Sequence, residues 1–443
     1  MTDVHTLTAI TDTLKTVYGQ GITNQFADEQ MTYNTIPKSE RSPKGLGYEF
    51  SIRYARAQGV GARAESSPLP EPLAGKYDKG KVLPKYIYGN LRITGPAIEA
   101  AKGDVAAFVD GLADAVDDIY ESLVNDMNRQ AWGDGFGLIA TSSAVATPST
   151  TTPWSVTCDN DMAVQRAVAG MIVDFYASGG AIDQSCVASR ITSVDPVNKT
   201  ITFEALVNGA GGSPYQALHP LTAARTYTIN AADTIPASSQ IVRYGARDAS
   251  FATSDTAIEM TGMDGIFDDG TLLATFENIL VASYPLWKAN ILANSGVGRE
   301  LSVDLLLQAV DVMRAKAKKK PGLMRMGLGQ RRKYANLLLP DVRFQPGKLQ
   351  GGYEVLTFAA GDGSIGMMID PMTTPGAIYV EPMGAVQKFE MTALGWGNLD
   401  QQIHQRQGYD EWDQFLRVYT QMGTEHRNSL VKIDDLVEPS LFT

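Results

Sequence analysis

The side chains most often used in catalysis are few and scattered in this sequence. Four histidines occur, and no two lie four residues apart as a zinc-protease helix requires. They are His5, His219, His404 and His426. A lone histidine is more often structural than catalytic, and hydrolase and kinase signatures are also missing. The sequence therefore predicts no catalytic residue and no metal site.

One segment partly matches a phosphate-binding loop. Residues 75–81, GKYDKGK, have its glycine and lysine spacing, but Val82 stands where serine or threonine would hold magnesium. Pro84 follows where the motif should open a helix. The Gly-Val-Gly of residues 59–61 is likewise followed by no helix pattern. We interpret both segments as loops and predict no cofactor.

Composition excludes further classes. The 443-residue chain is 44% hydrophobic and 20% charged, typical of a globular protein with two or three domains. Its net charge of −11 disfavours general nucleic-acid binding. Cys158 and Cys186 fit no metal or redox spacing and are expected to be unpaired thiols of a cytosolic protein. No secretory signal and no apolar run near ~18 residues is present, so we expect no membrane association.

Basic residues concentrate in one stretch. Nine of them fall between residues 314 and 333 with no acid among them. They are Arg314, Lys316, Lys318, Lys319, Lys320, Arg325, Arg331, Arg332 and Lys333. Such a stretch is either a solvated helix end with its loop, or a patch for an acidic partner or DNA.

The strongest expected elements are two strands and two helices. Apolar residues alternate over 48–54 and return over 86–93, which predicts an extended hairpin with a long polar tip. Two strands alone are marginal in water, so another surface should pack on them. Steps of three and four predict a helix over 104–131, about 40 Å long, with Asp104 as N-cap and Gly133 as stop. A second helix is predicted over 300–320.

The remaining segments carry weaker signals. Ser302 is the expected N-cap of the second helix, and Pro321-Gly322 its end. Residues 141–260 are rich in threonine, serine, glycine and β-branched residues, with turns at Asp195-Pro196 and Asn208-Gly209, which predicts a β-rich module. Asp268-Asp269-Gly270 is turn chemistry and not a calcium loop.

The order of these elements resembles the major capsid protein of tailed bacteriophages (Caudoviricetes), which has the Hong Kong 97-like fold. The most specific match is residues 128–137, NRQAWGDGFG, because capsid proteins often end their long helix with a similar Trp-Gly-Asp-Gly pattern. FDDGTLLATFENI followed by YPLWK resembles the return through the peripheral domain. SVDLLLQAVDVMRAK resembles the helix of the axial domain.

The resemblance implies an α+β fold with five parts. They are an N-terminal arm at 1–45, an extended β-hairpin loop at 46–100, a peripheral domain at 101–300, an axial domain at 301–385, and a return to the peripheral domain at 386–443. The spine helix, 104–131, and a β-rich elaboration, 141–260, belong to the peripheral domain. The elaboration is larger than the minimal fold requires.

The implied function is assembly and not catalysis. Copies would form the hexamers and pentamers of an icosahedral head around double-stranded DNA, without reading its sequence. Assembly would take place in the cytoplasm of the host bacterium, and the product would be the virion. The implied partners are a separate scaffolding protein, a portal and decoration proteins. An encapsulin-type compartment of the same fold is the alternative, and its enclosed cargo would be an enzyme.

Charged residues are the predicted inter-subunit contacts. Basic side chains of the extended loop would face acidic side chains of a neighbour's spine helix. The basic set is Arg53, Arg56, Arg63, Lys76, Lys79, Lys81 and Lys85, and the acidic set is Asp110, Asp114, Asp117, Asp118 and Glu121. No lysine stands out as a cross-linking residue. Exposed pairs contribute only about 0–1 kcal/mol each, so apolar burial must supply most of the assembly energy. Deletion of residues 56–85 is expected to abolish shells and leave a soluble monomer.

Overall fold

The computed structural model describes residues 31–41, 43, 45–96, 111–149, 152–159, 165–176, 189–205, 234–248, 256–338, 357–359, 363–397, 404–405 and 408–440. These residues form two compact units. Tyr88–Asn125 and Leu394–Arg417 belong to the smaller unit. Gln30–Ile87, Asp126–Ala393 and Val418–Thr443 are the segments of the larger unit.

The smaller unit consists of parts of long strands and of one long helix. These elements are β3 (Lys85–Thr94), α3 (Gly111–Trp132), β19 (Gln387–Trp396), β20 (His404–Gln405) and β21 (Glu411–Gly423). β21 pairs with β19, β20 and β3. Within the unit, α3 packs on β3, because a Cβ on Gly89 would lie 3.3 Å from the Ile119 side chain. Arg92 Nε donates to Asp413 Oδ1 at 2.7 Å and ties β3 to β21.

The long helix of the sequence analysis is present. It is described from Gly111, so the predicted cap Asp104 and Asp110 lie outside the described residues. It ends at Trp132, and the Gly133 amide donates to the Gln130 carbonyl at 3.0 Å, as expected for a stop at this glycine. The buried face at its end includes Met127, Ala131 and Trp132.

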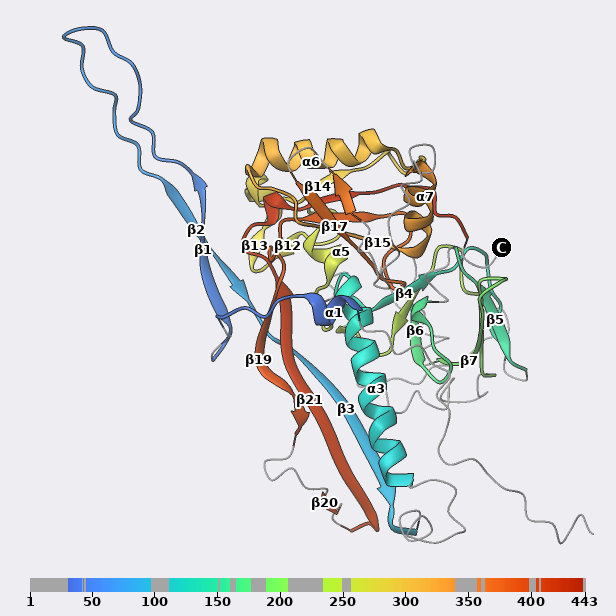
Figure 1. Ribbon diagram of the computed structural model, residues 1–443. Coiled ribbons are helices and arrows are strands. Elements are labelled where there is room, and N and C mark those ends of the chain that lie inside the picture. Colours follow the sequence, from blue (N-terminus) through green and yellow to red (C-terminus); the bar gives the residue numbers. More distant parts are fainter. Residues whose placement is uncertain are drawn as a thin grey trace, which may run out of the picture. The chain divides into compact units, whose positions relative to one another are not determined.

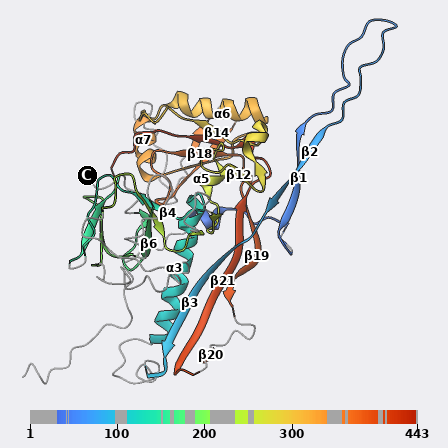
Figure 2. The same ribbon diagram turned by 180° about the vertical axis from the view of Figure 1, so that it is seen from behind.

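A mixed six-stranded sheet forms one core of the larger unit. Its order is β14 (Asn290–Leu292), β22 (Val431–Ile433), β18 (Ile378–Glu381), β15 (Leu323–Met326), β17 (Ser364–Ile369) and β16 (Thr357–Ala359). The pairs β14–β22 and β15–β17 are parallel, and the others are antiparallel. Figures 1 and 2 show α6 (Val303–Ala317) lying along this sheet and α7 (Leu328–Leu338) near it. Leu306 and Met313 of α6 are fully buried in the same core as Met324 and Val380.

The start of α6 confirms the predicted cap. The Ser302 hydroxyl accepts from the Leu305 amide at 3.2 Å, which satisfies one of the free donors of the first turn. The helix ends at Ala317, and Lys318 has a left-handed backbone with φ of 56°. The end therefore comes before the predicted Pro321-Gly322, because Lys318 already adopts the left-handed conformation that closes a helix.

The strands predicted between residues 141 and 260 form a second six-stranded sheet. The order is β4 (Leu138–Thr141), β9 (Gln240–Arg243), β6 (Ile172–Tyr176), β7 (Ser189–Asp195), β8 (Thr200–Phe203) and β5 (Trp154–Thr157). Beyond the two outermost strands, Ser142 bridges Cys158 and the Ser143 amide donates to the Thr157 carbonyl at 2.8 Å. These bonds join the first strand of the sheet to the last, so the sheet closes into a small barrel.

The barrel has its own core. Trp154, Phe175 and Phe203 pack together with ring centroids 4.7 to 5.6 Å apart. Cys158 is buried among these strands and unpaired, and burial raises the pKa of its thiol to about 12. The predicted turn at Asp195-Pro196 is present, with the Asp195 carboxylate accepting from the amides of Val197 and Asn198. Cys186 and the predicted turn at 208–209 lie outside the described residues.

Short elements connect the sheets of the larger unit. They are α1 (Met31–Thr35), β10 (Arg247–Asp248), β11 (Thr256–Ala257), α5 (Met263–Ile266), β12 (Thr275–Phe276), β13 (Ile279–Leu280), η4 (Val281–Ser283), η5 (Pro285–Trp287) and η7 (Arg427–Ser429). The turn predicted at Asp268-Asp269-Gly270 is confirmed, since the Asp268 carboxylate accepts from the amides of Gly270, Leu272 and Leu273.

The extended hairpin is present with a different second strand. β1 (Tyr48–Ala55) pairs antiparallel with β2 (Lys76–Val82), and not with the 86–93 stretch. That stretch is β3, which pairs with β21. The prediction of the return strand was wrong because β2, KYDKGKV, is too polar to stand out by apolar alternation, whereas β3 has the expected pattern.

Candidate functional site

The β1–β2 hairpin is the most distinctive surface of the larger unit. Figure 1 shows it projecting from the elements at its root. Beyond the paired strands, residues 56–75 continue as two extended segments that meet at a bridge between Gln58 and Leu73. All of residues 56–69 are exposed. A two-stranded ribbon has no core of its own, so in isolation it is only marginally stable.

Apolar side chains of the hairpin face solvent. Val60 is 92% exposed, Leu69 86% and Leu73 61%, and Tyr77 on β2 is 64% exposed. Next to the root, Leu46 and Leu83 are also exposed. Exposed apolar groups collected on one projecting element are typical of a surface that another protein covers.

The root of the hairpin is fixed by aromatic stacking. The ring of Tyr48 lies 5.4 Å from that of Phe389, and the ring of Phe50 lies 5.9 Å from that of Trp287. The Phe50 ring also lies over Gly80, where a Cβ would come within 2.4 Å of the ring. Any side chain at position 80 would have to displace the Phe50 ring, so this glycine lets the ring lie flat against β2.

Polar contacts add to this anchor. The Tyr48 hydroxyl donates to Glu425 Oε1 at 2.8 Å, and Arg41 Nη1 pairs with the same carboxylate at 3.0 Å. On the other strand, the Lys81 amide donates to the carbonyl of Glu277 at 2.8 Å. Both strands are therefore tied to the larger unit at their root.

Five of the seven predicted basic contacts lie exposed on the hairpin. They are Arg53, Arg56, Arg63, Lys76 and Lys79. Lys81 is half-buried and its Nζ lies 3.6 Å from Glu49 Oε1 of the paired strand. These six side chains spread along both strands and the distal segments, where they outnumber the four acidic residues of the hairpin, Glu49, Glu65, Glu71 and Asp78.

Lys85 departs from the prediction. It stands at the start of β3, and its ammonium donates to the carbonyl of Ala257. Burial lowers the pKa of this lysine. Its charge is thus used inside the subunit, because Lys85 begins β3 and does not lie on the β1–β2 hairpin.

Four of the five predicted acidic contacts lie on α3, in the smaller unit. Asp117 and Asp118 are exposed and Glu121 is half-buried with a partner of its own. Asp114 lies in α3, where only its backbone is described, and Asp110 lies outside the described residues. The adjacent, exposed carboxylates of Asp117 and Asp118 give this part of the helix a negative surface.

The NRQAWGDGFG segment is a buried connection and not a surface. Arg129 lies between Asp126 and Glu259, with nitrogen–oxygen distances of 2.9 and 2.5 Å. Gln130 accepts from the Met260 amide at 3.2 Å, and Gly262 lies so close that a Cβ would come within 2.3 Å of the Gln130 carbonyl oxygen. Sequence reasoning found this motif but not its partners at 259–262, which lie about 130 positions further on.

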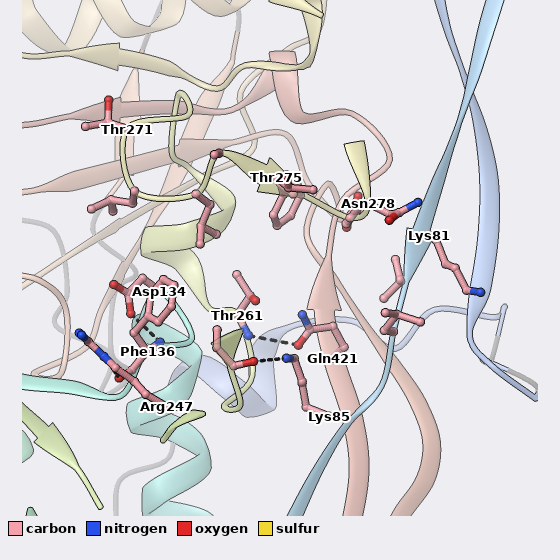
Figure 3. A pocket seen from close by; sticks show the side chains of 18 of the residues that line it. Lys81, Lys85, Asp134, Phe136, Arg247, Thr261, Thr271, Thr275, Asn278 and Gln421 are labelled. Atoms are coloured by element: carbon pink, nitrogen blue, oxygen red, sulfur yellow. Dashed lines mark hydrogen bonds between the residues drawn. The ribbon is translucent and has the colours of Figure 1, made fainter. Parts of the chain in front are cut away.

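An open cleft of about 830 Å³ adjoins the hairpin root. Figure 3 shows Lys81 near Asn278 on one side of the cleft, and Lys85 and Gln421 beside Thr261 nearer its middle. Asp134 and Arg247 line the same cleft. Arg247 is stacked 4.5 Å from the Tyr176 ring and is held by the Gln240 side chain at 2.7 Å. The lining mixes polar side chains with apolar ones such as Leu83 and Phe276, and it shows no nucleophile beside a base.

No metal centre is built in the described part of the chain. Within it, no three His, Cys, Asp or Glu side chains converge on one point. His426 is exposed, and partial desolvation lowers its pKa. His5 and His219 lie outside the described residues. Among the described helices, none combines the length and apolarity that a membrane crossing needs.

The basic stretch at 314–333 does not form one patch. Arg325 is buried and pairs with Glu381 at 2.9 Å. Lys316 donates to the Asn290 side chain at 2.6 Å, and Lys333 pairs with Glu300 at 2.5 Å. The nine residues are divided between the end of α6, the buried strand β15 and α7. This favours the interpretation as a solvated helix end with its loop over a patch for an acidic partner or DNA.

Solved structures share the fold of the chain from end to end. It matches a structure of the cyanophage A-1(L) capsid asymmetric unit over 98% of this chain and 99% of that one, with a TM-score of 0.57 and 11% identity. It matches the capsid of an empty GTA particle over 98% of this chain and 100% of that one, with a TM-score of 0.50 and 7% identity. No family model and no curated protein matches the sequence. The chain therefore has the α+β Hong Kong 97-like capsid fold.

Proposed function

We propose that the chain is a structural protein, the major capsid protein of a tailed bacteriophage, which assembles into the hexamers and pentamers of an icosahedral head around double-stranded DNA. The hairpin carries this proposal. It is anchored rigidly at its root and bears exposed apolar and basic side chains along its length. A neighbouring copy would bury these side chains. The same fold in two capsid structures supports this use of the hairpin.

Assembly energy would come from two sources on this surface. Burial of apolar side chains such as Val60 and Leu69 contributes about 25 cal/mol per Å² of apolar area removed from water. Charge pairing between the exposed basic residues and a neighbour's Asp117 and Asp118 would set orientation more than affinity. The head would be completed by a portal, a scaffolding protein and decoration proteins.

Electron microscopy of the purified full chain, alone and with the products of neighbouring genes, tests the proposal. Closed shells, hexamers or pentamers are expected. A strictly monomeric protein under both conditions would contradict the proposal. The content of any shell separates the two functions of this fold, because DNA indicates a virus and an enclosed enzyme indicates an encapsulin-type compartment.

A shortened hairpin tests the surface itself. Replacing residues 59–72 by a short glycine-rich turn removes Val60 and Leu69 but keeps β1, β2 and every root contact. We expect a folded, soluble subunit that forms no shells. The matched control is Val197→Ser, which removes an exposed apolar side chain from a barrel turn and should leave shells intact. Normal shells from the shortened chain would contradict the role of the hairpin.

A further inference from the structure

The turn between β12 and β13 has an unusual composition. Phe276 pairs with Ile279, and the two residues between them have positive φ, 50° for Glu277 and 64° for Asn278. Such turns favour Asn-Gly, because residues with a Cβ are strained in the left-handed region. Glutamate in the first position is therefore unfavourable for the backbone, and the contacts of its side chain must offset the strain.

These contacts place the Glu277 carboxyl group against the backbone of residues 423 and 424. Glu277 Oε1 accepts from the Thr424 amide at 2.9 Å. It lies where a Cβ on Gly423 would be only 2.3 Å away, so no side chain could stand there. Oε2 is shielded from solvent and has no hydrogen-bond partner among the described residues, although Glu277 as a whole residue is partly exposed. A buried oxygen without a partner is costly when it carries charge.

The same residue holds the hairpin. Its backbone carbonyl accepts from the Lys81 amide of β2 at 2.8 Å, while its side chain holds the end of β21 through Thr424. Next to it, Trp287 packs between Phe276 and Phe50 of β1. Glu277 thus links the hairpin root, through its backbone carbonyl, to the residue that follows β21, through its side chain.

The charged surroundings are mixed. The segment after β21 presents Glu425, His426 and Arg427, and Lys319 lies close enough to affect the first two. β2 presents Lys81, which pairs with Glu49. Burial raises the pKa of Glu277 to about 8, while the Thr424 amide and Arg427 lower it and Glu425 raises it further. Arg427 is already committed to the carbonyls of Ile266 and Gly265.

We propose that Glu277 is a proton-dependent clamp: in its neutral form it holds the hairpin root against the end of β21, and on losing its proton to solvent it releases the root. The clamp follows from a carboxyl group that has one partnered and one unpartnered buried oxygen on a strained turn. It is a property of the single subunit and does not rest on capsid assembly.

The direction of the pH dependence follows from linkage. The folded chain binds this proton more tightly than the unfolded chain, whose glutamate titrates near 4.5. The stabilisation is complete below that pH and is lost as pH rises toward about 8. Mildly alkaline solution should therefore loosen the hairpin root first.

Hydrogen exchange on the full chain tests the clamp at pH 6 and pH 9, after correction for the intrinsic exchange rates. We expect at least tenfold faster exchange of the amides of residues 76–82 at pH 9 in the unaltered protein. Glu277→Gln should abolish this difference, since its side chain carries no titrating proton. Glu300→Gln removes an exposed carboxylate of an ion pair and should leave the difference unchanged.

Glu277→Gly is a second variant in case glutamine prevents folding, because glycine accepts the positive φ without strain. It should likewise show no pH dependence at residues 76–82. The clamp is refuted if either folded variant keeps the response of the unaltered protein. Equal corrected exchange at both pH values in the unaltered protein would also refute it.

Discussion

Some positions accept only a small residue because two backbone segments come very close together there. Gly262 lies against the carbonyls of Gln130 and Ala131 at the end of α3, where a Cβ would come within 2.3 to 2.4 Å. Beside it, the buried Arg129 is neutralised by Asp126 and Glu259. Desolvation favours the neutral acid in both carboxyls, but Arg129 and Arg243 outweigh it and lower the pKa of Asp126, whereas the pKa of Glu259 is raised. The helix end is thus fixed by packing and by charge.

Gly262→Ala should destabilise the chain by about 1–3 kcal/mol, the range typical of overpacking, because neither backbone can yield easily. Urea unfolding followed by circular dichroism measures the change. Gly133→Ala is the control from the same motif, since its Cβ would meet nothing closer than 3.6 Å. Equal stability of the two variants would show that α3 can move away from the 259–262 segment.

Elements with local signals could be predicted from the sequence. Ser302 begins α6 as expected, because a cap and an apolar face lie within a few residues of each other. The hairpin partner could not be predicted. β3 finds its partner in β21, and Arg92 and Asp413 are 321 positions apart, so no pattern within a short window contains the pairing.

The candidate site was predictable to a similar extent. Five basic side chains are exposed where the loop was expected, since a polar Gly- and Pro-rich stretch has no means of burying them. Lys85 was misplaced because the carbonyl that holds it belongs to Ala257, far along the chain. The contacts of Glu277 with Thr424 and Lys81 gave no sequence signal at all.

The barrel should behave as an element with its own stability. Trp154→Ala removes the centre of the aromatic trio and should cost about 3–5 kcal/mol. Because the barrel core is separate from the core under α6, protection from hydrogen exchange should be lost in residues 200–203 and kept in 378–381. Val197→Ala in an exposed barrel turn is the control. Uniform loss of protection in both segments would mean that the two cores unfold as one.

At the scale of the whole molecule, the prediction concerns charge between copies. Changing Arg53, Arg56, Lys76 and Lys79 to glutamate should prevent assembly in low salt, and adding Asp117→Lys and Asp118→Lys should restore it. Light scattering at several ionic strengths measures both effects, which salt should weaken. Lys318→Glu with Lys320→Glu changes exposed charges beyond α6 and should be neutral. Failure of the compensating changes would show that the hairpin meets a different acidic surface.

The place of β22 in its sheet has a consequence for the chain during synthesis. β22 is the last of the six strands along the chain, yet it lies between β14 and β18. A chain still on the ribosome can complete the barrel but leaves an open slot beside β14, whose partner is made about 140 residues later. The newborn subunit therefore acquires its finished sheet only after residue 433 has been made, so products truncated before β22 lack the strand that joins β14 to β18.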